Sequence, residues 1–118
     1  MSKMKTLIML VLLFGLSTPA LALYHSNLTV NRIMTNSDGS VHVEFNEQPP
    51  NTCSYYGVTV KLDGTSRGGK NILATLLMLK VNQSKLSIWY EESSAKGNTQ
   101  SSGCNHTTLS TLNSVRMD

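Results

Sequence analysis

The sequence predicts a small, mainly β domain that carries a single helix. Apolar and polar residues alternate in four short segments, residues 28–34, 41–45, 57–62 and 85–90, as is typical of half-buried strands. Residues 72–81 differ, because eight of the ten are apolar and none is proline or glycine, which predicts a helix. A last strand is expected around residues 113–117, after a short helical turn that begins near Leu109.

The segments between these elements have the composition of turns and loops. Asn36-Ser-Asp-Gly-Ser40 carries turn chemistry and predicts a hairpin between the first two strands. Pro49 and Pro50 interrupt the sheet, because proline cannot donate to a strand ladder. Residues 63–69 and 91–103 are rich in glycine, serine and other polar residues, so we expect two loops, the second one mobile.

The predicted order is therefore strand, strand, strand, helix, strand, strand. This order is that of a small five-stranded barrel of the oligonucleotide/oligosaccharide-binding (OB) type, with its helix between strands 3 and 4. An α+β sandwich, with the helix on an antiparallel sheet, also fits. Apolar side chains cover most of the helix, so it either closes the open end of a barrel or packs against another subunit. Leu73, Leu77 and Met78 are the candidate interface residues.

Residues 1–22 have the pattern of a secretory signal peptide. Lys3 and Lys5 precede an apolar run at residues 7–16, and Ser17-Thr-Pro-Ala-Leu-Ala22 ends in an Ala-x-Ala cleavage pattern. The run is too short for a membrane span, which needs about 20 apolar residues. We therefore expect cleavage near Ala22, no membrane span, and residues 23–118 as a single OB-like domain that is secreted or periplasmic.

The composition of residues 23–118 excludes several classes of protein. These 96 residues hold 8 Lys and Arg against 7 Asp and Glu, a net charge of +1, which does not favour a nucleic-acid partner. A domain of this size has a marginal core that a covalent link would stabilise. Cys53 and Cys104 are its two cysteines, and in an oxidising compartment we expect them to form a disulfide.

No catalytic or metal-binding pattern is found among the histidines. None of His25, His42 and His106 is spaced for metal ligation. We expect His25 in a frayed terminus, and His42 beside Glu44 on the solvent face of a strand. The sequence thus predicts no metal ion, no cofactor and no enzymatic activity, and a small secreted hydrolase is the least favoured class.

Four residues are candidates for binding a glycan. Tyr55, Tyr56 and Trp89 offer aromatic faces on which the C–H face of a sugar ring can stack. Arg67, in Arg67-Gly-Gly-Lys70, would contribute to a weak anion or sialic-acid site at the start of the helix. The alternatives remain open: the aromatic rings pack over the barrel end or at a subunit contact, and the glycine pair forms only a turn and a helix cap.

The segment from residue 70 to 116 resembles a family of bacterial toxin subunits. It contains the apolar helix, the strand Leu86-Ser-Ile-Trp-Tyr-Glu91, Ser102-Gly-Cys104 and the closing Leu109-Ser-Thr-Leu-Asn-Ser-Val-Arg116. These stretches are similar to the binding (B) subunit of subtilase cytotoxin and pertussis-like toxins, and to related small secreted bacterial proteins. The resemblance implies an exported barrel that binds cell-surface glycans, forms a ring, often a homo-pentamer, and partners a catalytic A subunit. The alternative function is a monomeric secreted or periplasmic accessory protein without a glycan site.

Overall fold

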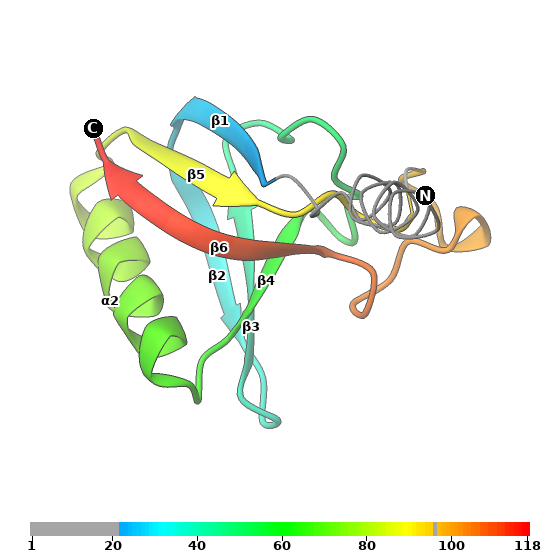
Figure 1. The fold of residues 1–118 in the computed structure, drawn as a ribbon, viewed down its shortest axis with the longest axis horizontal. Helices are drawn as coiled ribbons and strands as arrows, with labels where there is room; N and C mark the ends of the chain where they lie inside the picture. Colours follow the sequence, from blue (N-terminus) through cyan, green and yellow to red (C-terminus); the bar gives the residue numbers. More distant parts are fainter. Residues whose placement is uncertain (1–21, 96) are drawn as a thin grey trace, which may run out of the picture.

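The computed structural model describes residues 22–95 and 97–118, so the predicted signal peptide lies outside the described residues except for Ala22. Within these residues the fold consists of a six-stranded sheet, one α-helix and one 3₁₀ helix (Figure 1). The predicted mainly β domain with one long helix in this part of the chain is confirmed. The elements are β1 (Leu23–Leu28), β2 (Val30–Thr35), β3 (Ser40–Phe45), β4 (Val60–Asp63), α2 (Arg67–Asn82), β5 (Leu86–Tyr90), η1 (Gln100–Ser102) and β6 (Ser110–Met117).

The strands follow the order β1-β5-β6-β4-β3-β2 across the sheet. All neighbours are antiparallel except β4 and β6, which are parallel. In Figure 1, β5 and β6 cross over β2, β3 and β4, with α2 along one end. The outermost strands β1 and β2 are consecutive in the chain, with Thr29 alone between them, and within the described residues no ladder joins one to the other.

The structure differs from the predicted five strands in having a sixth, β1. His25, expected in a frayed terminus, instead pairs with Ile88 of β5, and its Nε2 lies 2.9 Å from Oε1 of Glu47. The sequence before Leu28 gives only a weak alternation, and Thr29 carries no turn signal, so nothing local marks a separate strand.

The helix begins five residues before the predicted start, at Arg67. Ser66 caps it, because the backbone N–H of Gly69 donates to Ser66 Oγ at 2.9 Å. Gly69 is also required by packing, since a Cβ there would clash with the backbone carbonyl of Asp63. The composition of residues 63–69 predicts a loop there, but the cap and this packing place Gly68 and Gly69 in the first turn of the helix despite the low helix propensity of glycine.

The core lies between α2 and the inner face of the sheet. Leu76 and Leu79 of the helix are fully buried against a main cluster contributed by all six strands. A smaller cluster, which we call the disulfide cluster, consists of Cys53, Val58, Ala95, Cys104 and Leu109. The predicted disulfide between Cys53 and Cys104 is confirmed, with the two Cα atoms 5.8 Å apart. It ties the long loop after β5 to the loop before β4.

The last segment also differs from its prediction. The strand β6 begins at Ser110, where a helical turn was expected, and the short helix of this region is instead η1, at residues 100–102. Within residues 22–95 and 97–118, no helix has the length and apolar character needed to cross a membrane.

Candidate functional site

Tyr55 and Tyr56 form a tight turn in the loop between β3 and β4. Tyr55 and Val58 exchange two backbone hydrogen bonds of 2.9 and 3.2 Å, and the residues between them, Tyr56 and Gly57, have φ of +52° and +93°. Two successive positive φ values are typical of a type I′ turn, in which glycine is favoured at the second position. The turn directs the Tyr56 ring outward, and this side chain is 75% exposed.

The two tyrosine rings are held in a fixed arrangement. Their centroids lie 4.6 Å apart at an interplanar angle of 71°, an edge-to-face contact. Tyr55 packs against the disulfide cluster, so the covalent link supports it from below. Arg32 of β2 fixes the turn from the other side, since its Nη2 donates to the carbonyl oxygen of Tyr56 at 2.5 Å and its Nε donates to Glu44 at 2.9 Å. The pair is therefore a rigid aromatic feature on the surface.

Polar groups surround this pair. A hollow of about 350 Å³ lies beside both rings and is also lined by Ser54, Asn98 and Gln100. The Oδ1 of Asn98 accepts from the backbone N–H of Ser54 at 3.2 Å, which positions the amide. A second hollow, of about 290 Å³, lies on the other side of Tyr56, toward Met34 and Lys80. We call this surface, made of Tyr55, Tyr56 and their polar neighbours, the tyrosine site.

Another hollow, of about 350 Å³, extends from Tyr55 to His42, His106 and the tip of the β2–β3 hairpin. His42 was predicted on a solvent face, and that prediction is wrong, because the residue is only 5% exposed. The alternation along β3 places its side chain on the face opposite Val41 and Val43, where Tyr55 and His106, from the loops before β4 and β6, line the same hollow.

His42 is buried without a hydrogen-bond partner for one ring nitrogen. Within the described part of the chain, Nδ1 is buried and unpaired. Burial is the main cause that lowers the pKa of His42, and the charge of His106 acts in the same direction. The charge of Lys61 lowers this pKa further, and that of Asp38 opposes the shift. The imidazole of His42 is thus held in its neutral form.

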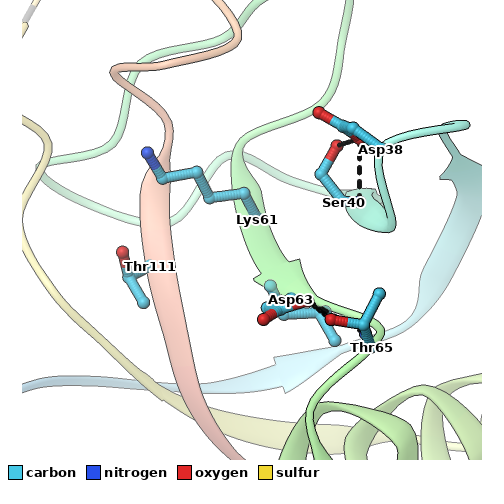
Figure 2. Close-up of a pocket in the computed structure, with 7 residues that line it drawn as sticks. Asp38, Ser40, Lys61, Asp63, Thr65 and Thr111 are labelled. Carbon is cyan, nitrogen blue, oxygen red and sulfur yellow. Dashed lines mark hydrogen bonds between the residues drawn. The ribbon is translucent and has the colours of Figure 1, made fainter.

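A hollow of about 440 Å³ lies beside the hairpin tip, over the paired strands β4 and β6 (Figure 2). Its lining includes Asp38, Lys61 and Asp63. Oδ1 of Asp38 accepts from the backbone N–H and the hydroxyl of Ser40, at 2.9 and 2.6 Å. Thr65 makes the same two bonds to Oδ1 of Asp63. These hydrogen bonds lower the pKa of both carboxyl groups below the usual value, so both stay ionised.

Trp89 lies in a different aromatic cluster, away from the tyrosine site. It lies on the face of β5 opposite the buried Leu86, Ile88 and Tyr90, as the alternation predicts. Its ring centroid is 4.9 Å from that of Tyr24, and the Arg116 guanidinium carbon lies 5.3 Å from the Trp89 centroid. The sequence interpretation missed Tyr24 and Arg116, although pairing of β1 with β5 would have found Tyr24 opposite Trp89.

The remaining candidates lie on α2. Arg67 is exposed at the first residue of the helix, and no described contact joins it to the tyrosines or to Trp89. Leu73 packs partly against the core, whereas Leu77 is 49% exposed and Met78 is similarly exposed. With Val81, which is 83% exposed, they form an apolar stripe on the outer face of the helix. The structure thus brings together only two of the four predicted glycan contacts, Tyr55 and Tyr56.

Among the residues that the structure describes, no three of His, Cys, Asp and Glu lie close enough together to hold a metal ion. The fold and the surface define a small, mainly β domain with an exposed aromatic and polar site at Tyr55 and Tyr56. No protein-family model matches the chain, and no curated protein matches it.

Proposed function

We propose that the chain is a secreted or periplasmic, non-enzymatic domain that binds a glycan at the tyrosine site. The observation that carries this proposal is the exposed Tyr56 ring, in edge-to-face contact with the Tyr55 ring and flanked by hydroxyl and amide groups. A sugar ring offers C–H bonds on its faces and hydroxyl groups on its rim, so it needs both an aromatic face and polar partners. The tyrosine site supplies both without further rearrangement.

The proposed scaffold is an OB-like barrel in which β1 and β2 act as one bent strand. Two features support this. The two strands are separated by a single residue and lie at opposite ends of the sheet order, and β4 pairs in parallel with β6. Counted this way, five strands remain and the helix lies between the third and the fourth. Proteins of this fold bind oligosaccharides and oligonucleotides on surfaces formed by strands and connecting loops.

The proposal extends to assembly into a ring, as in the toxin subunits that the sequence resembles. The apolar stripe at Leu77 and Met78 would form part of the contact between subunits. A ring of weak sites gains affinity for a cell surface, because linked sites bind with a high effective concentration. A catalytic A subunit would be the partner of such a ring.

The first test is a glycan array probed with the protein exported to an oxidising compartment. Tyr56→Ala should abolish retention by the array, because it removes the exposed ring while leaving the core intact. Tyr24→Ala is the matched control, since Tyr24 is also exposed, at 47%, but lies in the Trp89 cluster. Loss of binding in both variants or in neither would refute the assignment of the tyrosine site.

The mass of the exported protein in solution separates the proposed ring from the alternative function. Light scattering that finds a discrete oligomer supports multivalent binding. A single chain at all concentrations, with no glycan retained by the array, would instead favour a monomeric accessory protein.

A further inference from the structure

We infer that the glycan surface continues from Tyr55 across the outer face of β3 and β4 to the carboxylates of Asp38 and Asp63, and that it takes a neutral, hydroxyl-rich oligosaccharide rather than a sialylated one. This inference rests on the proposed function and specifies the class of ligand. It concerns the two hollows beside the β2–β3 hairpin tip, which we call the β3–β4 groove.

The two hollows are neighbours because they share part of their lining. Asp38 and Ser40 belong to both. One hollow, of about 350 Å³, ends at Tyr55, which also belongs to the tyrosine site. The other, of about 440 Å³, ends at Asp63 and Thr111 (Figure 2). Each is as large as a small-molecule site, so the groove has room for more than one sugar unit.

The charges along the β3–β4 groove are unfavourable for an anionic ligand. Asp38 and Asp63 contribute two carboxylates, while Lys61 is the only lysine or arginine among the described residues that lines either hollow. The Nζ of Lys61 already donates to the carbonyl oxygen of Thr107 at 2.5 Å. A sialic-acid carboxylate in the groove would face two like charges and a single lysine, whose ammonium already makes one hydrogen bond. Sugar hydroxyls, in contrast, donate to carboxylates and form strong, charge-assisted hydrogen bonds.

The buried His42 also favours a ligand with hydroxyl groups. It lines the hollow beside Tyr55, is more than nine-tenths buried, and within the described residues its Nδ1 has no hydrogen-bond partner. A neutral imidazole nitrogen is either a donor or an acceptor, depending on the tautomer, and a hydroxyl can pair with either. A carboxylate can only accept. Nδ1 itself is closed to solvent, so a ligand hydroxyl would pair with it only if the side chains that line the hollow shift aside; it would then satisfy a group that the protein leaves unpaired.

The test uses neutral oligosaccharides and their sialylated counterparts, with lactose and 3′-sialyllactose as the first pair and array hits as further pairs. Dissociation constants are measured by calorimetry at pH 7.5. We expect the neutral sugar of each pair to bind more tightly. In Asp38→Asn the Oδ1 that accepts from Ser40 remains and the charge is lost, so binding of the neutral sugar should weaken roughly tenfold.

Glu47→Gln is the matched control, because it removes a carboxylate that pairs with His25 outside the groove. Amide shifts of the unmodified protein on titration with the neutral sugar, at Ser40, Lys61 and Thr111, provide a readout that needs no variant. Tighter binding of the sialylated sugars would overturn the inference. The inference would also be overturned if Asp38→Asn bound the neutral sugar as tightly as Glu47→Gln does. If Tyr56→Ala still abolished binding in that case, the proposed function would stand. If no sugar binds and no amide shifts, both fall together.

Discussion

Removing the disulfide by the double substitution Cys53→Ala and Cys104→Ala tests how the site is supported. The link joins residues 51 positions apart and both sulfur atoms are buried. In the chain-entropy account, a loop of this length restricts the unfolded chain enough to stabilise the fold by about 4 kcal/mol. A small domain has a total stability of about 5–15 kcal/mol, so this is a large share.

The effect is measured by guanidinium and thermal unfolding of the double variant. The expected loss of about 4 kcal/mol corresponds to a fall in Tm of roughly 15–30 °C for a domain of this size. Reduction of the unmodified protein is the control, because it opens the link without removing the sulfur atoms from the disulfide cluster. A loss below about 1 kcal/mol under both conditions would refute the reasoning, since the loops would then be held by their hydrogen bonds alone.

Three further predictions concern the helix and the buried histidine. Gly69→Ala should destabilise the fold by about 1–3 kcal/mol in urea unfolding, because the new Cβ would clash with the backbone of Asp63. Gly68→Ala has open space around the new Cβ and should be neutral or stabilise by up to about 1 kcal/mol. Equal effects of the two substitutions would contradict this account of the packing. The pKa of His42 is lowered by burial and by the charge of His106. The free energy of unfolding should therefore be highest above about pH 6.5, where an exposed histidine is neutral, and should fall as the pH drops below that value. The urea midpoint of His42→Phe, compared at pH 7.5 and 5.5, should show a smaller fall than that of the unmodified protein, and an unchanged difference would exclude this residue as the cause. Leu77→Glu should convert an oligomer that forms through the helix to single chains, as measured by light scattering. The circular dichroism spectrum should be retained, because the Leu77 side chain is half exposed. An oligomer that stays intact would exclude this face of the helix as the contact.

Local patterns were sufficient for most of the fold. Alternation of apolar and polar residues found β2, β3, β4 and β5, although only β4 shows the matching alternation of burial. The even cysteine count, in a chain expected to be exported, predicted the disulfide. The helix was found but its first turn was missed, since Gly68 and Gly69 argue against a helix unless the cap and the neighbouring loop are known. The strand β1 was missed because pairing with β5 holds it, and that contact is distant in the sequence.

Less of the candidate site than of the fold could be predicted from the sequence. Tyr55 and Tyr56 were candidates from the sequence because they are neighbours beside Cys53, and the structure places their rings in contact. His42 was placed on the correct face of its strand, but which loops cover that face depends on the disulfide and on the path of residues 104–108. The groove formed by Asp38 and Lys61 depends on how the hairpin tip lies beside β4 and β6, and no spacing in the sequence encodes that position.

The continuity of β1 and β2 has a consequence for aggregation. These strands form both margins of the sheet and belong to one stretch of 13 residues, Leu23 to Thr35. Local detachment of that single stretch would uncover the backbone edges of β5 and β3 at the same time, and bare strand edges recruit strands from other molecules. Leu28 and Val30, fully buried on either side of Thr29, hold the stretch in place. Resistance to polymerisation by strand addition therefore depends on the docking of one short N-terminal segment more than on the global stability of the domain.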